Sequence, residues 1–272
     1  MTTLCLGRQD AEAPARSGPL AVVRRMAVEI TVITVVFVAY NLVRLLAASD
    51  VTGAFSTAGR VWELERWMRL PSEQSLQSLT LDMPKLVEAA NWYYIAFHFP
   101  VIVGTLLWLF FRRPAGYTWC RNALMASGVV ALVLYMLVPV APPRLMPDLG
   151  FVDTGLRYGQ SVYGPEAHGT LSNQFAAMPS LHVGWALIIA VVLIKTSRTR
   201  WRWLFALHPV LTLLVVVVTG NHYWLDGMVG MVLVSVALWV TRHWARTQAL
   251  RPEPRPRVID LTASESAQPV PA

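Results

Sequence analysis

The chain has 272 residues, of which 55% are hydrophobic and only 14% charged, and its formal net charge is +7. A soluble domain carries roughly 25% charged residues, so this composition argues against a soluble protein and for a membrane protein. The positive charge would also fit a nucleic-acid-binding protein, but its distribution along the chain indicates membrane topology, and we expect no nucleic-acid partner.

Six apolar runs are long enough to be transmembrane helices, which need about 20 mostly apolar residues. In chain order the runs cover residues 26–48, 89–111, 122–141, 180–196, 203–220 and 223–242. The predicted fold class is therefore all-α, an integral membrane bundle of six transmembrane helices. We expect a cytoplasmic arm at 1–25, the membrane domain at 26–245 and a disordered cytoplasmic tail at 246–272, most of which lacks apolar periodicity.

Basic residues orient this bundle. They precede the first run, separate the second from the third and the fourth from the fifth, and follow the sixth. If the helices alternate in direction, all of these positions fall on one side, and cytoplasmic loops attract such charge. We therefore expect a multi-pass protein of the cell membrane with both termini in the cytoplasm. The excess of arginine over lysine is typical of a GC-rich bacterial genome.

Two loops on the extracytoplasmic side are long. Within 49–88, residues 61–70 predict an amphipathic helix, which would either guide lipid substrate at the interface or simply pack over the bundle. Its predicted apolar face comprises Trp62, Leu64, Trp67, Met68 and Leu70, with Glu63, Glu65, Arg66 and Arg69 elsewhere. The polar loop at 142–178 would suit a lid or an acceptor-binding segment.

Three short motifs stand where an apolar run meets a polar segment: Ala-Pro-Pro-Arg at 141–144, Met-Pro-Ser-Leu-His at 178–182, and Gly-Asn-His-Tyr-Trp-Leu-Asp at 220–226. In a six-helix bundle all three emerge on the extracytoplasmic side. Two histidines, a carboxylate and an arginine would then share one pocket at the bilayer surface.

The second motif predicts an anion site. His182 stands just inside a helix, after a proline that suits the first helical turn. Ser180 and the free N–H groups of that turn would bind an anion, because a helix N-terminus carries unpaired donors and a positive partial charge. A histidine beside such a site can protonate a leaving oxygen.

The third motif predicts a nucleophile. His222 and Asp226 are four residues apart, which places their side chains on one face of a helix. A carboxylate that binds one imidazole nitrogen leaves the other free to attack. Arg144 can hold phosphate oxygens with its planar fork. With Ser180 and Asn221, it completes the predicted substrate-binding residues.

The other histidines are expected to have no part in the site. We interpret His98 as a hydrogen-bonded bundle residue rather than a proton donor. His208 and His243 fall near the cytoplasmic ends of their helices, and His168 is a loop residue without an evident partner.

The motifs resemble those of the type 2 phosphatidic acid phosphatase superfamily, and more closely its branch related to fungal inositol phosphorylceramide synthase, the aureobasidin-resistance protein. Residues 178–182 resemble the second motif of that branch and residues 221–226 its third, while Glu65 to Leu70, Glu73 and Gln77 resemble an upstream region of bacterial members. The resemblance implies a six-helix bundle and a phosphohistidine intermediate, with His222 as nucleophile, Asp226 orienting it and His182 as general acid.

The sequence departs from the phosphatases at several positions. Their Pro-Ser-Gly-His reads Pro-Ser-Leu-His here, and the arginine six positions before the third-motif histidine is replaced by Val216. The first motif, with its lysine and arginine, is not evident, so Arg144 would take its place, with Arg157 as a possible second cation.

The sequence thus predicts an enzyme without cofactor or metal that acts on a membrane lipid phosphate or diphosphate. With water as acceptor it is a phosphatase, and with an alcohol such as a sugar or inositol hydroxyl it is a phosphotransferase. Two rivals remain open. His182, His222 and Asp226 could ligate a metal, or the protein could be a non-catalytic lipid-binding protein or transporter.

Overall fold

The computed structural model describes residues 18–46, 51–161 and 174–249. In this part of the chain the regular elements are helices, and the one β-bridge joins Val140 to Ala176, which agrees with the predicted all-α class. The helices are α1 (Pro19–Leu46), α2 (Val51–Trp67), α3 (Glu73–Leu81), α4 (Pro84–Trp92), α5 (His98–Arg112), α6 (Pro114–Leu137), α7 (Thr154–Arg157), α8 (Leu181–Thr196), α9 (Leu207–Val218) and α10 (Trp224–Ala249).

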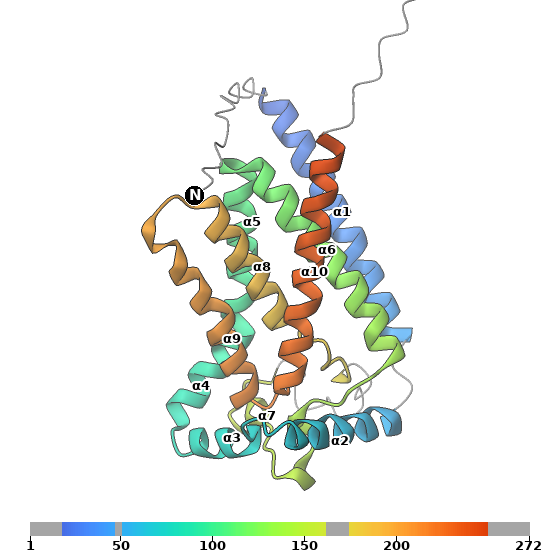
Figure 1. The fold of residues 1–272 in the computed structure, drawn as a ribbon, viewed down its shortest axis with the longest axis vertical. Coiled ribbons are helices and arrows are strands. Elements are labelled where there is room, and N and C mark those ends of the chain that lie inside the picture. The colour runs from blue at the N-terminus through green and yellow to red at the C-terminus, as the bar shows by residue number, and fades with distance from the viewer. Residues whose placement is uncertain (1–17, 47–50, 162–173, 250–272) are drawn as a thin grey trace, which may run out of the picture.

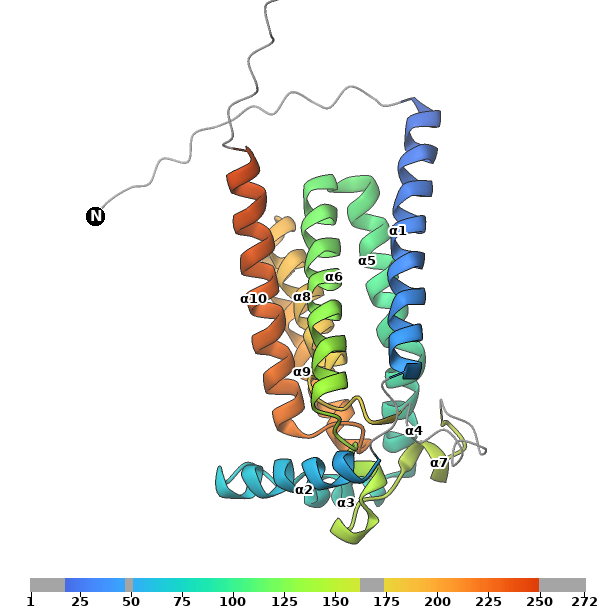
Figure 2. The same cartoon turned by 90° about the vertical axis from the view of Figure 1, so that its right-hand side faces the viewer.

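The long helices run side by side along the long axis of the molecule, whereas α2 and α3 lie across one end of the bundle (Figures 1 and 2). The loops that carry the three motifs lie at this same end. The junctions α5–α6 and α8–α9, the start of α1 and the end of α10 lie at the opposite end. The arginine-rich segments of the sequence therefore lie at one end of the bundle, which agrees with the alternating helix directions that the topology prediction assumes. That the arginine-rich end faces the cytoplasm remains a prediction.

Four helical stretches among the described residues are long and apolar enough to cross a membrane. They are Pro84–Arg112, Pro114–Leu137, Arg200–Val218 and Trp224–Thr247. Helix α8 is apolar but has only 16 residues, and α1 has 28 residues without being among the four. The chain is therefore compatible with a multi-pass membrane protein, and a count of six spans remains a prediction.

Several helices extend beyond the apolar runs that predict them. Helix α1 begins at Pro19 rather than near residue 26, and α10 continues to Ala249 rather than ending near residue 242. The physical reason is that hydropathy marks the apolar layer, whereas helical hydrogen bonds continue through Arg-rich turns. Arginine has high helix propensity, and its long side chain can reach out of that layer.

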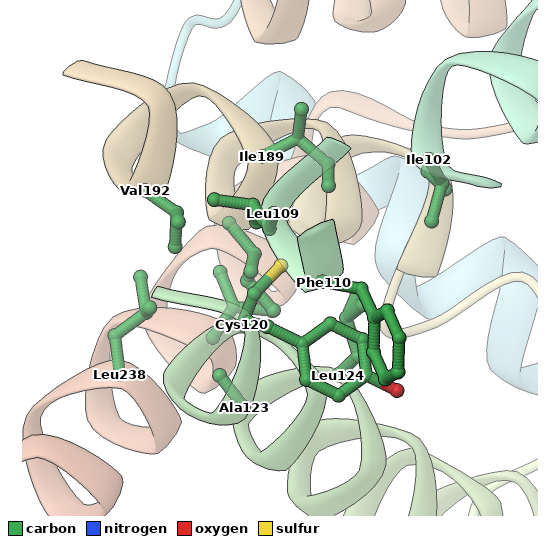
Figure 3. Close-up of a cluster of buried hydrophobic side chains, with 12 residues drawn as sticks. Ile102, Leu109, Phe110, Cys120, Ala123, Leu124, Ile189, Val192 and Leu238 are labelled. Atoms are coloured by element: carbon green, nitrogen blue, oxygen red, sulfur yellow. The ribbon is translucent and has the colours of Figure 1, made fainter. Parts of the chain in front are cut away.

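One apolar core cluster lies between α5, α6, α8 and α10 (Figure 3), and a second one joins α2 to the motif loops through residues such as Ala58, Ala141 and Tyr223. Leu109, Cys120, Ile189 and their neighbours are buried in the first cluster. Helix α1 contacts this group from outside through Val22 and Met26, and Glu29 of α1 forms an ion pair with Arg121 of α6. This packing keeps the helix ends that carry the motifs in place.

The predicted apolar face of the amphipathic helix is divided: Trp62 and Leu70 pack against buried residues, whereas Leu64, Trp67 and Met68 are exposed, so contact of this face with lipid remains a prediction. In α2 the buried residues are Ala54, Ala58, Val61 and Glu65, whereas Trp67 is 80% exposed. The small residues allow α2 to approach the loops beneath it closely. Glu65 points inward because its carboxylate accepts a backbone N–H at the start of α10, which a sequence pattern of apolar side chains does not reveal.

Candidate active site

The second and third motifs bring two histidines together. His182 lies in the first turn of α8 and His222 lies just before α10, and the centroids of their rings are 5.9 Å apart. A phosphorus atom between the two rings could therefore be reached from both. This separation is short enough for both histidines to act on one phosphoryl group, as the hypothesis from the sequence requires.

Backbone contacts fix the start of α8 against α10. Ser180 is the N-cap of α8, its hydroxyl accepts the N–H of Val183 at 3.4 Å, and its own N–H donates to the carbonyl of Asp226 at 2.9 Å. Pro179 therefore lies before the N-cap, not in the first turn as we expect from the sequence. Because Ser180 is fully buried and already caps the helix, its part in substrate binding remains a prediction.

A tight turn after α9 presents His222. Gly220 has φ +69°, a left-handed conformation that favours glycine, and a Cβ atom there would lie 2.9 Å from Nε2 of Gln77. The N–H groups of Asn221 and His222 then donate to the carbonyl of Val216 at 2.9 and 3.1 Å. The loop thus folds back over the last turn of α9 and directs the imidazole inward.

The hydrogen bonds of His222 define which of its nitrogens is free. Nδ1 lies 2.9 Å from the carbonyl oxygen of Ala177 and 3.3 Å from Oδ2 of Asp226. A carbonyl oxygen only accepts hydrogen bonds, so Nδ1 carries a proton, and in the neutral imidazole Nε2 is the nitrogen that keeps its lone pair. The spacing of four residues between His222 and Asp226 therefore produces the contact that the sequence predicts.

Asp226 is itself held rigidly. Its side chain is fully buried, and Oδ2 also accepts the N–H of Tyr223 at 2.9 Å. Two glutamates extend the same pattern around the first turn of α10. Glu65 accepts the N–H of Leu225 at 2.7 Å, and Glu73 accepts that of Trp224 at 3.4 Å. Three carboxylates thus satisfy the backbone donors that the start of α10 exposes.

One of these carboxyl groups is strongly perturbed. Burial, together with the neighbouring carboxyl of Glu73, raises the pKa of Glu65 to about 9. Arg66 forms an ion pair with Glu73 at 2.9 Å but lies 4.0 Å from Glu65. Glu65 is therefore neutral near pH 7, and it supports the start of α10 without adding a second full negative charge beside Asp226. Sequence analysis places Glu65 outside the apolar face and assigns it no partner.

Arg144 lies beside the same loop but is not an isolated cation. Its Nε donates to Oδ1 of Asn221 at 3.2 Å, and its Nη1 forms an ion pair with Oδ2 of Asp153 at 3.1 Å. Its backbone N–H donates to the carbonyl of Gly220 at 2.7 Å. The first and third motifs are therefore joined directly, and Asp153 is a site residue that sequence analysis does not single out.

Arg144, Asp153 and Asn221 line a small open pocket. Most of its lining residues have polar side chains, and they come from three parts of the chain: Asn91, Tyr94 and Ile95, then Arg144, Asp153, Gly155, Gln160 and Ser161, and finally Asn221. Asn91 donates to the carbonyl of Thr154 and to Gln160 at 3.2 and 3.0 Å, which fixes this wall. The pocket adjoins the histidines, because Tyr94 stacks on His182 and Asn221 precedes His222.

Two histidines that we expect outside the site belong to its surroundings. His98 is 1% exposed, its ring centroid is 4.9 Å from that of His182, and neither of its nitrogens has a hydrogen-bond partner among the described residues. Our interpretation of His98 as a hydrogen-bonded residue is therefore wrong. The ring centroid of His208 lies 5.9 Å from that of His98, so the prediction that His208 lies away from the surroundings of the site is also wrong. The reason is that α9 packs against α8 and against the π-helical turn Tyr93–Phe97, which precedes His98.

Other candidates lie elsewhere. Arg157 is exposed at the end of α7, 5.9 Å from the ring of Tyr158. His243 is exposed near the far end of α10 and stacks on Trp239, as its predicted position requires. His168 lies outside the described residues, as does much of the loop that we consider a lid. Within the described part of the chain, no group of three or more His, Cys, Asp or Glu residues is arranged to hold a metal ion.

Comparison with known proteins assigns the chain to a family. No curated protein and no solved structure matches it. A family model described as the PAP2 superfamily matches residues 59–240, which include the three motifs, the two site histidines and Asp226. Members of this superfamily are phosphatases or phosphotransferases. Because the match covers most of the chain, this protein belongs to the PAP2 superfamily.

Proposed function

We propose that the protein transfers a phosphoryl group from a membrane lipid phosphate or diphosphate to water or an alcohol, through a phosphohistidine at His222. One observation supports this most directly. The carbonyl of Ala177 and the carboxylate of Asp226 both bind Nδ1 of His222, so Nε2 is the free, unprotonated nitrogen. Because His182 faces the same ring, a general acid is available on the other side of the phosphorus.

In the first half of this reaction, Nε2 of His222 attacks phosphorus, and the bond from phosphorus to the lipid oxygen breaks. His182 gives its proton to that oxygen, which leaves as an alcohol or as the shorter phosphate. Asp226 keeps the imidazole oriented and stabilises its positive charge while the N–P bond exists. Arg144, held by Asp153 and Asn221, is positioned to bind the phosphoryl oxygens.

In the second half, an oxygen nucleophile attacks the phosphohistidine and passes its proton to His182 as the N–P bond breaks. The enzyme returns to its starting state with no net gain or loss of protons. No metal is needed in these steps, because the protein groups supply the nucleophile, the acid and the cation.

An alcohol acceptor is the second candidate, and the polar pocket favours it. Asn91, Asp153, Gln160 and Asn221 line the pocket beside His222, and amides and carboxylates of this kind bind hydroxyl groups. Transfer to a sugar or inositol hydroxyl also fits the resemblance to the synthase branch. We place the site on the extracytoplasmic face of a bacterial cell membrane, in agreement with the positions of the arginines.

The direct test is to trap the intermediate. Purified protein in detergent is mixed with lipid phosphates and diphosphates labelled with ³²P, quenched within milliseconds and examined for acid-labile, base-stable label on the protein. We expect label on His222 and none in the His222→Gln variant. His243→Gln, which changes an exposed histidine of the opposite end, is the matched control and should label normally. Label in His222→Gln equal to that in the unaltered protein would refute the mechanism.

The acceptor is then identified by chasing the labelled protein. Water, glycerol, inositol and simple sugars are added separately, and the labelled product is analysed. Release as inorganic phosphate alone identifies a phosphatase. A phosphorylated alcohol formed faster than phosphate identifies a transferase.

A further inference from the structure

The two site histidines are supported in different ways. Nδ1 of His222 is hydrogen-bonded to the carbonyl of Ala177 and to the carboxylate of Asp226. His182 has no hydrogen bond to any residue that the structure describes; its neighbours are rings. Tyr94 stacks on it with centroids 4.4 Å apart, and the rings of His98 and Phe99 lie at 4.9 and 5.7 Å. A general acid with two N–H groups needs an acceptor for the one that does not face the substrate.

His98 is the group that can supply this acceptor. Tyr94 presents its ring face to His182, and Phe99 has no polar atom. His98 is buried, and both of its nitrogens lack partners in the described residues. Burying a polar group without a hydrogen bond costs on the order of 1–3 kcal/mol, so such a group requires an explanation. A hydrogen bond formed when His182 is charged provides one.

The backbone that carries Tyr94 and His98 is unusual, and its shape allows both rings to contact His182. A π-helical turn, Tyr93–Phe97, separates α4 from α5 within one continuous helix. The wider turn places Tyr94 and His98 against the same ring of His182. Single π-helical turns within α-helices are frequently found at functional sites. The turn therefore supports the view that this part of the helix is shaped around His182.

We propose that His98 is the positioning residue of the general acid: a nitrogen of neutral His98 accepts the second N–H of the His182 imidazolium, which orients its first N–H toward the leaving oxygen. This inference rests on the proposed function of the site. No bond is made or broken at His98. The proton that leaves goes from His182 to the lipid oxygen and returns from the incoming water or alcohol.

The surroundings of His98 suit this role. On its other side lies His208, whose Nδ1 is 2.9 Å from the hydroxyl of Tyr93, and that hydroxyl also lies 2.9 Å from Oγ1 of Thr212. His182, His208, Tyr93 and Tyr94 are the titratable groups that face this part of α5 among the described residues, with His222 beyond His182. No carboxylate contacts His98 there to hold it charged, so it is available as a neutral acceptor.

The test compares two leaving groups. An ordinary lipid phosphate has an alkyl leaving oxygen that must be protonated, whereas a nitrophenyl phosphate with an alkyl chain has one that departs without a proton. We expect His98→Phe to slow single-turnover phosphoryl transfer from the first substrate by about 10- to 100-fold, the effect of a hydrogen bond to a charged group. The rate with the nitrophenyl substrate should remain within about twofold of the unaltered protein.

A second variant and the pH profile sharpen the test. His98→Gln retains an acceptor oxygen and should recover most of the rate with the alkyl substrate. In His98→Phe the His182 imidazolium loses its acceptor, so the fall of that rate at high pH should begin at lower pH. His243→Phe, an exposed histidine that stacks on Trp239, is the control and should change neither substrate.

Each outcome has a definite meaning. Selective loss with the alkyl leaving group supports the inference. Equal loss with both substrates assigns His98 a structural role only, and no loss assigns it none; either overturns the inference. If the unaltered protein fails to transfer phosphate from both substrates, or if His222→Gln still reacts, the proposed function fails instead.

Discussion

The imidazole rings of His182 and His222 lie with their centroids 5.9 Å apart, although one belongs to the start of α8 and the other to the loop before α10. Two close packing contacts make this possible. A Cβ atom on Gly230 would lie 2.3 Å from the carbonyl oxygen of Ser180, and one on Gly184 would lie 2.8 Å from Val234. The distance between the histidines is therefore set by how closely α8 approaches α10.

Gly230→Ala should separate these helices. The added methyl group meets backbone rather than a flexible side chain, so α8 must move, and overpacking of this kind costs about 1–3 kcal/mol. We expect a lower melting temperature and a lower rate of phosphoryl transfer. Gly104→Ala is the control, because a Cβ there meets no atom within 4 Å and alanine favours a helix. Unchanged activity in Gly230→Ala would show that the spacing is not critical.

Asp226→Asn should nearly abolish turnover. Asparagine fits the same space and keeps an acceptor oxygen, but it lacks the negative charge that stabilises the positively charged imidazole of His222 while the N–P bond exists. In serine proteases the equivalent change lowers kcat by about 10⁴, and we expect a loss of that order in single-turnover labelling of His222. Asp148→Asn, at an exposed carboxylate, is the matched control. A loss below tenfold would contradict the assigned role of Asp226.

Arg144→Lys should weaken substrate binding more than it slows the chemical step. Lysine keeps the charge but loses the planar fork that binds Asn221 and Asp153. We expect KM for a lipid phosphate to rise by about 10- to 100-fold, the effect of hydrogen bonds to a charged group. Arg157→Lys tests the second cation that the sequence suggests, and because Arg157 is exposed over Tyr158, its KM should hardly change. Equal effects in both variants would mean that Arg144 is not the main cation.

The stability of the protein should depend on pH through Glu65. The folded state holds the proton of this carboxyl up to about pH 9, whereas the unfolded chain loses it near its ordinary value of 4.5. The stabilisation is therefore complete below about pH 4.5 and is lost as the pH rises toward 9. The charged groups that face Glu65 are Glu73, Asp226 and Arg66.

Glu65→Gln should remove this dependence, because the amide keeps an acceptor for the N–H of Leu225 and does not titrate. We expect its apparent melting temperature in detergent to fall less between pH 6 and pH 9 than that of the unaltered protein. Glu63→Gln, which changes an exposed neighbour, is the control. Parallel curves for the unaltered protein and Glu65→Gln would show that Glu65 is not the group responsible.

The local parts of the site could be predicted because they depend on short spacings. His222 and Asp226 are one helical turn apart, and Nδ1 does lie against the carboxylate. The presence of a helix start just before His182 could also be predicted, although Ser180 is the N-cap and Pro179 lies before it. In contrast, the inward direction of Glu65 could not be predicted. Apolar periodicity assigns charged side chains to the exposed face, and it contains no information about the unpaired N–H groups that α10 presents to α2.

The surroundings of His182 show the same limit. Sequence position suggests a hydrogen-bonded role for His98 and a separate location for His208. The π-helical turn changes which residues of that helix face α8, and α9 packs against this turn, which brings His208 beside Tyr93 and His98. A spacing of four between Tyr94 and His98 was the available signal, but nothing in the sequence marks His182 as the ring that both contact.

The sequence by itself determined the helical class, the alternation of basic ends and the candidate residues for the chemistry, because hydropathy, charge and spacings within one helical turn are local properties. Only the tertiary structure decided which rings and carboxyl groups meet. Those contacts depend on how closely α8 and α10 approach at Gly184 and Gly230 and on which helix lies over the start of α10. Such distances arise from packing between segments far apart in the chain.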